Sequence, residues 1–308
     1  MPLSRKTGGS GMKHKTILIL GATGMLGHTL LAFFSRREDI NVHATVRSID
    51  GLSALLPQHL LARLRAGVDA DNFDSVAGVL AAVKPDVVIN CIGIVKQLPE
   101  AADPIASIAI NALFPHRLAN ECGRINARLI HISTDCVFSG NKGGYAENDF
   151  PDCGDLYGRT KLLGEVAGPG CVTLRTSIIG HELNSKYGLI EWFLSQKGKV
   201  RGFAHAIYTG FPTSEMAHII GEHVIPNKDL NGLYHVSSDR ISKYDLLRLV
   251  AERYGKQIKI ERHEEFYCDR SLDSSRFRNI TGYRPPPWRE MVDKMYQHFL
   301  GASFYRKS

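Results

Sequence analysis

The 308-residue sequence has no apolar run long enough to span a membrane. Its longest uninterrupted apolar stretches, such as residues 16–20 and 87–89, have the length of strands. The first fifteen residues are polar and basic and lack the apolar segment of a secretory signal, so we expect residues 1–14 to be a flexible leader. These absences predict a protein without a membrane partner.

The cysteines do not form a recognisable framework. None of them has C-x-x-C spacing or clusters with histidines, although the chain contains six: Cys91, Cys122, Cys136, Cys153, Cys171 and Cys268. This pattern argues against a metal site and against a set of disulfides, and it favours a reducing compartment. We therefore expect a cytoplasmic protein without a bound metal.

A basic block interleaved with aromatic residues is also missing, so we expect no nucleic acid partner. The formal net charge of +7 is compatible with an anionic ligand such as a nucleotide, and equally with an ordinary solvated surface. With 44% hydrophobic and 22% charged residues, the composition is that of a soluble globular protein of one large or two small domains. The sequence is compatible with a homodimer but does not establish one.

What the chain does contain is a glycine turn between an expected strand and an expected helix. Residues 16–20 are rich in β-branched residues and leucine, and Gly21, Gly24 and Gly27 follow directly. In a dinucleotide-binding turn, the first glycine allows a sharp bend, the second lets a diphosphate approach backbone N–H groups, and the third lets helix and strand pack closely. The alternative is a purely structural turn, but the position directly after a strand favours a dinucleotide.

The residues after a second expected strand, 41–46, favour NADP over NAD. A chain that selects NAD places an acidic residue about twenty positions beyond the glycines, whereas this chain has Val46 and Arg47 there. Because a guanidinium pairs with the 2′-phosphate of NADP, Arg47 predicts NADPH, with NADH as the alternative; otherwise Arg47 is a surface residue. Residues 66–69 are expected to be the end of a third strand, and Asp69 lies either near the adenine edge of the cofactor or at the start of the next turn.

Strands and helices continue to alternate up to residue 176. We expect a buried strand at 85–93 that ends in small residues, helices at 73–83 and 104–124, and strands at 127–132 and 171–176. This alternation predicts a parallel, doubly wound α/β sheet that binds ligands at the carboxyl ends of its strands. Asn111, polar within an apolar stretch, is expected to bond backbone or water near that site.

The stretch 131–165 carries the candidate catalytic groups. Thr134 stands at a strand end, and Asp155 is the expected cap of a helix with Tyr157 and Lys161 on one face. A lysine beside a phenol lowers its pKa, so Tyr157 could give a proton to a carbonyl oxygen to which Thr134 also hydrogen-bonds. About one Tyr-x-x-x-Lys pair is expected by chance in such a chain. The Tyr157–Lys161 pair therefore indicates a catalytic site only in combination with the glycine turn.

The pattern is looser beyond residue 177. Residues 189–196 are an apolar stretch, and we expect a strand at 232–236 and helices at 214–224, 243–254 and after residue 288. We interpret residues 15–176 as an NAD(P)-binding Rossmann domain. Residues 177–308 are then mainly a substrate-binding region, with some segments returning to the Rossmann domain.

The motifs Gly21-x-x-Gly24-x-x-Gly27, Ser133-Thr-Asp-x-Val-Phe-x-Gly140, Tyr157-Gly-x-Thr-Lys-Leu-x-Gly-Glu165 and Leu174-Arg-Thr-Ser177 resemble the extended short-chain dehydrogenase/reductases, above all their dTDP-4-dehydrorhamnose reductase branch. The resemblance implies NADPH-dependent reduction of the C4 keto group of a nucleotide-activated deoxysugar. The best match is dTDP-4-dehydro-L-rhamnose to dTDP-L-rhamnose, a step of polysaccharide biosynthesis. Thr134 would bind the carbonyl, Tyr157 would protonate it, and Lys161 would bind the nicotinamide ribose.

The motifs and the resemblance together give the expected contact residues. Besides Tyr157 and Lys161, the expected cofactor contacts are Gly21, Thr23, Gly24, Met25, Leu26, Gly27, Arg47, Asp69, Cys91, Ile92, Gly93 and Asn111. The expected substrate contacts are Val95, Cys136, Thr176, His181 and Thr213.

Two other functions stay open. A cysteine at position 136, followed later by His181, resembles GDP-fucose synthase, a bifunctional epimerase-reductase whose cysteine and histidine epimerise beside the keto group; otherwise Cys136 is a small buried residue. The non-catalytic regulatory subunit of methionine adenosyltransferase also has this fold and similar motifs. A sugar 4,6-dehydratase is disfavoured, because Cys136 follows Asp135 where a dehydratase has glutamate.

Overall fold

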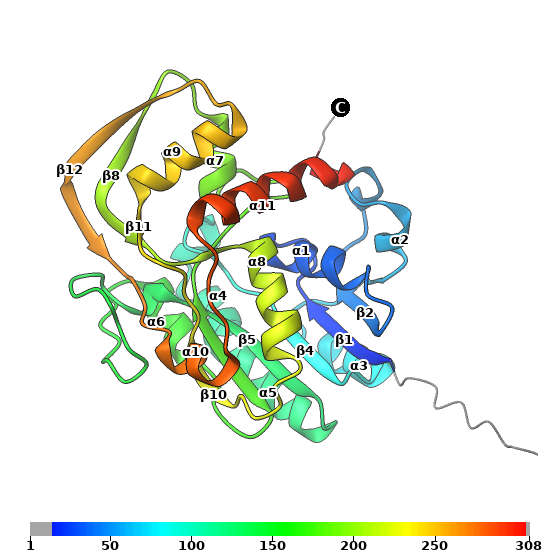
Figure 1. Ribbon diagram of the computed structural model, residues 1–308. Helices are drawn as coiled ribbons and strands as arrows, with labels where there is room; N and C mark the ends of the chain where they lie inside the picture. The colour runs from blue at the N-terminus through cyan, green and yellow to red at the C-terminus, as the bar shows by residue number, and fades with distance from the viewer. Residues whose placement is uncertain (1–13, 306–308) are drawn as a thin grey trace, which may run out of the picture.

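A seven-stranded parallel sheet forms the centre of the molecule (Figure 1). In the computed structural model, which describes residues 14–305, the strand order is β10-β6-β5-β4-β1-β2-β3. The strands are β1 (Lys15–Leu20), β2 (Ile40–Thr45), β3 (Leu64–Arg65), β4 (Val87–Asn90), β5 (Arg128–Thr134), β6 (Cys171–Thr176) and β10 (Gly232–His235), paired in parallel. The order reverses between β1 and β4, which confirms the predicted doubly wound fold. Apart from His14, the expected leader lies outside the described residues.

The central strands are continuous apolar runs because helices cover both faces of the sheet. Residues 17–20 of β1 are fully buried. Ile17 and Ile19 belong to one hydrophobic core, which also contains α1 (Met25–Phe34). Leu18 and Leu20 belong to a second core with α3 (Phe73–Val83) and α5 (Phe114–Arg124). Successive side chains of β1 therefore point to opposite faces of the sheet and pack into different cores.

The long helix predicted at 104–124 is present but is not α-helical throughout. α4 (Pro104–Ser107) passes into a π-helical segment, η3 (Ile108–Leu113), and then into α5. Asp103 caps α4, because its carboxylate accepts hydrogen bonds from the N–H groups of the first turn. π-Helical turns occur frequently at functional sites, and this one carries Asn111.

Most other elements before residue 177 begin or end close to the predicted positions. α6 (Leu156–Leu163) begins after Asp155, whose carboxylate accepts from the N–H of Gly158 at 2.8 Å, so the predicted cap is confirmed. A third strand is present, but its predicted end is wrong, because β3 ends before residues 66–69. Gly67 has a φ of +75°, a left-handed conformation that ends the strand. The connecting loops contain the short turns η1 (Leu52–Ala54), α2 (Gln58–Leu61), η2 (Pro99–Ala102) and η4 (Asp135–Val137).

The chain after β6 builds a second sheet, β11-β8-β12, at one end of the molecule (Figure 1). Its strands are β8 (Lys199–Tyr208), β11 (Ile241–Ser242) and β12 (Lys259–Asp269). The sequence did not predict β8 or β12. β12 is an edge strand, and its largely exposed, charged residues lack the apolar pattern that indicates a strand.

The remaining elements connect this second sheet to the central one. β10 pairs with β6, and α8 (Thr213–His218) packs against α1. The elements are β7 (Ile178–Ile179), α7 (Leu189–Ser195), β9 (Phe211–Pro212), α8 (Thr213–His218), the π-helical η5 (Ile219–Val224), α9 (Lys243–Tyr254), α10 (Ser275–Thr281), α11 (Trp288–Gly301) and η6 (Ser303–Tyr305). Within the part of the chain that the structure describes, no helix has both the length and the apolarity to cross a membrane.

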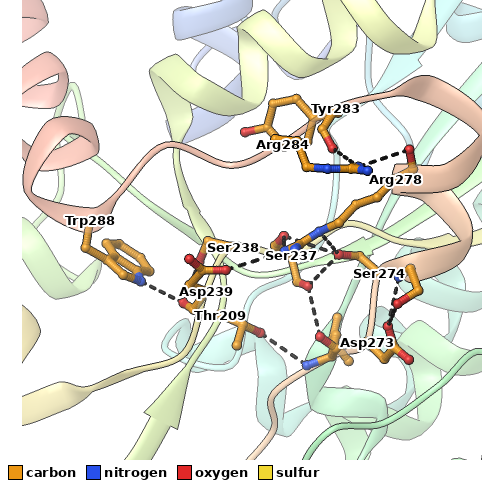
Figure 2. A network of polar contacts seen from close by, with 12 residues as sticks. Thr209, Ser237, Ser238, Asp239, Asp273, Ser274, Arg278, Tyr283, Arg284 and Trp288 are labelled. Atoms are coloured by element: carbon orange, nitrogen blue, oxygen red, sulfur yellow. Dashed lines mark hydrogen bonds and ion pairs between the residues drawn. The ribbon is translucent and has the colours of Figure 1, made fainter.

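A network of hydrogen bonds ties separate C-terminal segments together (Figure 2). The indole N–H of Trp288 donates to the carbonyl of Asp239 at 2.7 Å, and the N–H of Leu272 donates to the hydroxyl of Thr209 at 3.2 Å. The network continues through Ser237, Ser238, Ser274 and Arg278. Because Thr209 follows β8 directly, these bonds fix the end of β8 where it approaches the cavities described below.

Candidate active site

The glycine turn between β1 and α1 has the geometry predicted from the sequence. Gly21 has a φ of +86°, in the left-handed region that favours glycine. A Cβ at Gly27 would lie 2.0 Å from the carbonyl oxygen of Gly21, so only glycine allows helix and strand to approach this closely. Gly24 is the N-cap of α1, and no side chain caps this helix start. The backbone N–H groups of its first turn therefore remain suited to an anion.

Asn111 holds the loop that follows β4. Its Oδ1 accepts from the N–H of Ile94 at 2.9 Å, and its Nδ2 donates to the carbonyl of Ile94 at 2.9 Å. A Cβ at Gly93 would lie 3.3 Å from Asn111 Oδ1 and 3.9 Å from Lys161 Nζ. The prediction that Asn111 bonds backbone is confirmed, and a glycine at position 93 keeps the space beside Lys161 open.

Thr134, Tyr157 and Lys161 meet at the carboxyl end of β5. Thr134 Oγ1 accepts from the N–H of Cys136 at 3.1 Å and donates to Asp135 Oδ1 over a long 3.3 Å. The Thr134 hydroxyl also lies close enough to Tyr157 to favour its ionised form. Lys161, one turn after Tyr157 on α6, is buried, and its Nζ donates to the carbonyl of Ile132 at 2.8 Å. The structure therefore brings the three predicted groups together.

Burial has the largest effect on the pKa values of Tyr157 and Lys161. Loss of solvent raises the pKa of Tyr157, and the effect outweighs the opposing contribution of Thr134. The prediction that Lys161 lowers the pKa of Tyr157 is wrong for this structure, because the ammonium is directed at the carbonyl of Ile132. Burial also lowers the pKa of Lys161 to about 8. Tyr157 is therefore a protonated phenol at neutral pH, the form that can donate a proton.

One cavity of about 490 Å³ contains most of the predicted residues. It extends from the glycine turn past the ends of β4 and β5 to the start of the C-terminal region. Its lining includes Thr23, Gly24, Met25, Leu26, Cys91, Ile92, Gly93, Val95, Thr134, Cys136, Tyr157, Lys161 and Thr176. The tight turn, the uncapped helix start and the open space at Gly93 fit a dinucleotide.

Asp69 lies at the start of the next turn, the second of the two positions that the sequence suggested for it. Its carboxylate accepts from the N–H of Asp71 at 3.1 Å, and its own N–H donates to the hydroxyl of Ser75 at 2.9 Å. Asp69 thus begins the turn into α3 and is not part of the cavity lining. The cofactor role assigned to Asp69 remains a prediction.

Arg47 is exposed beyond β2, and no described residue forms a hydrogen bond or ion pair with its guanidinium. We expect Arg47→Ala to weaken NADPH binding roughly tenfold or more relative to NADH, because a charged hydrogen bond to the 2′-phosphate is lost. Titration of both cofactors measures the ratio, with Arg201→Ala, an exposed arginine on β8, as the control. An unchanged NADPH-to-NADH ratio in Arg47→Ala would remove the argument for NADP selection.

His181 and Thr213 lie away from the cavity lining. The ring of His181 is buried, with Nδ1 2.5 Å from Glu191 Oε1 and Nε2 2.8 Å from the Tyr254 hydroxyl. The expectation that His181 lies beside the substrate is therefore not met, because both ring nitrogens already have partners inside the C-terminal core. Thr213 Oγ1 lies 3.1 Å from Thr29 Oγ1, within hydrogen-bond distance. Within residues 14–305, no group of three or more His, Cys, Asp or Glu side chains could hold a metal ion.

A second cavity, of about 460 Å³, shares Asp135 and Tyr208 with the first. Aromatic side chains form much of its wall: Tyr187, Trp192, Phe203, Tyr208 and Phe266. Lys243 and Arg270 also line it, and neither forms an ion pair with a described carboxylate. Lys243 Nζ lies 5.4 Å from the ring centre of Trp192, and Arg270 Nε donates to the carbonyl of Phe138 at 2.8 Å. The cavity is thus suited to a planar ring and an anion.

Sequence reasoning missed the residues of this second cavity. Trp192, Phe203, Lys243 and Arg270 are distant from one another along the chain, and no short motif contains them. Two of them stand on or next to β8 and β12, the strands that the sequence did not predict. A weak signal existed in Trp192, one of only two tryptophans, within an apolar segment.

A buried ion pair lies behind Lys161. Glu165 accepts from Arg175 through two bonds of 2.7 Å each, and its Oε1 also accepts from the Ser133 hydroxyl at 2.7 Å. The side chains of Arg175 and Glu165 are only 3% and 11% exposed. The negative charge of Glu165 favours the protonated form of Lys161. The pair thus connects β6 with the residues that follow α6 and supports the charge of Lys161.

Comparison with known proteins agrees with this geometry. The family model described as RmlD substrate binding domain matches residues 15–300. Methionine adenosyltransferase 2 subunit beta of Danio rerio is 27% identical over 258 residues, 79% of this chain and 75% of the relative. dTDP-4-dehydrorhamnose reductase of Mycolicibacterium smegmatis is 27% identical over 252 residues, 78% of this chain and 69% of the relative.

Among solved structures, dTDP-4-dehydrorhamnose reductase of Bacillus anthracis in complex with NADP has a TM-score of 0.77 and 20% identity. The match covers 92% of this chain and 99% of the other. This likeness shows a shared fold. The sequence relatives include both a reductase and a subunit of a different enzyme, so the reaction has to be argued from the site.

Proposed function

Because this chain belongs to the RmlD substrate binding domain family, we propose that it reduces the C4 keto group of a nucleotide-linked deoxysugar with NADPH. The observation that carries the proposal is the convergence of Thr134, Tyr157 and Lys161 in a cavity that begins at the glycine turn. A binding module needs no proton donor at this position, whereas a ketone reductase does. The NADP in the complex of the Bacillus anthracis reductase supports the choice of cofactor.

Each of these residues has a separate role in the proposed reduction. Bound NADPH would supply the hydride to the carbonyl carbon. Tyr157, protonated because burial raises its pKa, gives its proton to the carbonyl oxygen, and the product is an alcohol. The Thr134 hydroxyl, released from its long bond to Asp135, can donate to the same oxygen. Lys161 would bind the nicotinamide ribose, and Glu165 supports the charge of its ammonium.

The second cavity supports a nucleotide-linked substrate. A sugar that reacts beside Tyr157 would extend past Asp135 and Tyr208, two of the residues that both cavities share. Arg270 and Lys243 would then neutralise the diphosphate, and the aromatic wall would hold the base. Within this class we propose dTDP-4-dehydro-L-rhamnose, because the similar reductases are named for dTDP-4-dehydrorhamnose.

The proposal is tested with a panel of keto-sugar nucleotides and both reduced cofactors, followed through the loss of NAD(P)H absorbance. We expect oxidation of NADPH with dTDP-4-dehydro-L-rhamnose and slower oxidation of NADH. Oxidation only with another nucleotide or sugar would keep the reaction class and change the substrate. No oxidation with any member of the panel would contradict the proposal.

An epimerase-reductase is less compatible with the structure. Cys136 lines the cavity, but His181, the second group that epimerisation would need, is buried elsewhere with both nitrogens bonded. Burial also raises the pKa of Cys136 to about 12, so its thiol is a poor base at neutral pH.

We therefore expect no solvent deuterium to enter the carbons beside the ketone during turnover. Mass spectrometry of the product formed in deuterated water measures this for the wild type and for Cys136→Ser. Deuterium in the wild-type product that disappears in Cys136→Ser would favour the epimerase-reductase.

A regulatory subunit is the second candidate, because methionine adenosyltransferase 2 subunit beta is similar over 79% of the chain. For this function the cavity would bind NADP without turnover, and a catalytic partner would be required. Tight NADP binding together with no turnover of the whole panel would favour it. The intact set of Thr134, Tyr157 and Lys161 favours the enzyme.

A further inference from the structure

The last described turn of the chain, η6, packs against the helix that begins at the glycine turn. Figure 1 shows α11, which leads into η6, running past α1. The hydroxyl of Tyr305 lies 2.6 Å from Nε2 of His28, a residue of α1 277 positions earlier. The rings of Phe304 and Tyr305 both meet the His28 ring edge to face, at centroid distances of 5.8 and 5.5 Å.

His28 continues this contact to the residue at the helix start. Its Nδ1 lies 2.8 Å from the carbonyl oxygen of Gly24, which accepts hydrogen bonds and cannot donate one. Nδ1 must therefore carry the proton, and in a neutral ring Nε2 is then the acceptor for the Tyr305 hydroxyl. Burial lowers the pKa of His28 to about 4, so the ring is neutral at physiological pH. The two bonds thus have one defined direction, from Tyr305 through His28 to Gly24.

The Gly24 carbonyl belongs to the peptide whose N–H is that of Met25, the first residue of α1. Gly24 and Met25 both line the cavity. The Gly24 carbonyl accepts the first bond of α1 from the backbone N–H of His28 at 3.1 Å, and the ring Nδ1 of His28 adds a second bond to the same oxygen. This second bond further restrains the orientation of the Gly24–Met25 peptide, and the Thr29 hydroxyl, which donates to the Met25 carbonyl at 3.0 Å, restrains the next peptide.

We infer that Tyr305 is a positioning residue for cofactor binding: through His28 it orients the Gly24–Met25 peptide, whose N–H is placed to meet the diphosphate of NADP(H). The inference rests on the proposed use of this cofactor. It assigns the C-terminal turn a part in cofactor affinity, although Tyr305 is not part of the cavity lining. It also implies that any partner that pulls this turn away from α1 would weaken cofactor binding.

The test compares NADP⁺ affinity, by calorimetry, in the wild type, Tyr305→Phe and a control, Tyr267→Phe. Tyr267 is 72% exposed and stacks on His205 of the second sheet, far along the chain from the glycine turn. We expect Tyr305→Phe to weaken NADP⁺ about fivefold, the effect of one lost hydrogen bond, and to leave dTDP affinity unchanged. Tyr267→Phe should bind both ligands as the wild type does.

Two His28 variants distinguish the bond between Tyr305 and His28 from the bond between His28 and Gly24. His28→Asn keeps a donor near the Nδ1 position and loses the partner of Tyr305, so it should match Tyr305→Phe, and the double variant should be no weaker. His28→Gln loses the donor to Gly24 and should bind NADP⁺ more weakly than either.

Three outcomes would overturn the inference. Unchanged NADP⁺ affinity in Tyr305→Phe would do so. Equal losses for NADP⁺ and dTDP together with a lower melting temperature would assign Tyr305 a purely structural role. No NADP⁺ binding by the wild type would instead overturn the proposed cofactor, and the inference with it.

Discussion

Replacing Tyr157 with phenylalanine is expected to lower kcat by about 10²–10⁴-fold, the range that a general acid contributes. The phenyl ring keeps the packing of Tyr157 on α6 and removes only the hydroxyl that would protonate the carbonyl oxygen. NADP⁺ affinity should change little, because the glycine turn and Lys161 remain. Single-turnover kinetics with NADPH and the keto-sugar nucleotide measure the loss. Near-normal turnover in Tyr157→Phe would refute the role of Tyr157 as the acid.

Tyr267→Phe serves as the matched control, because it removes a phenol hydroxyl from an exposed position outside both cavity linings.

The pH dependence of kcat gives a second check on the same site. Because burial raises the pKa of Tyr157, the phenol stays protonated throughout the neutral range. The pKa of Lys161 is about 8, so its ammonium is present below pH 8 and lost above it. If the ammonium is required, kcat of the wild type should therefore fall as the pH rises through about 8.

Replacing Arg175 with methionine is expected to destabilise the protein by about 3–5 kcal/mol, the usual cost of leaving one charge of a buried pair unpaired. Glu165 would lose two bonds of 2.7 Å at a position where only 11% of its side chain is exposed. The midpoint of thermal unfolding should fall by roughly 5–15 °C. Calorimetry of the cofactor-free protein measures the change.

The chain offers a surface pair of the same type as a control. Arg289 donates to Glu252 through two bonds of 2.8 and 3.1 Å, but the two side chains are 65% and 59% exposed. Solvent screens exposed pairs, so Arg289→Met should lower the melting temperature far less than Arg175→Met. Equal effects of the two substitutions would contradict the importance of burial for the Glu165–Arg175 pair.

Local spacing was enough to predict much of the site. Gly21, Gly24 and Gly27 act through the backbone of one turn, and Tyr157 and Lys161 lie on one face of one helix. Relations of this kind depend only on residues a few positions apart, which a sequence pattern records directly. The parallel sheet was predictable for the same reason, because continuous apolar runs alternate with helical segments.

By itself, the sequence determined the doubly wound sheet, the glycine turn and the three catalytic candidates, since each follows from the order of neighbouring residues. Only the tertiary structure decided that His181 is buried with Glu191 and Tyr254, that Lys243 and Arg270 share an aromatic cavity, and that Tyr305 reaches His28. It also decided the direction of the pKa shift of Tyr157, because burial raises this pKa and outweighs the opposing contribution of Thr134. The physical reason is common to all of these: desolvation and contact depend on which distant segments pack around a side chain, and no local pattern contains that information.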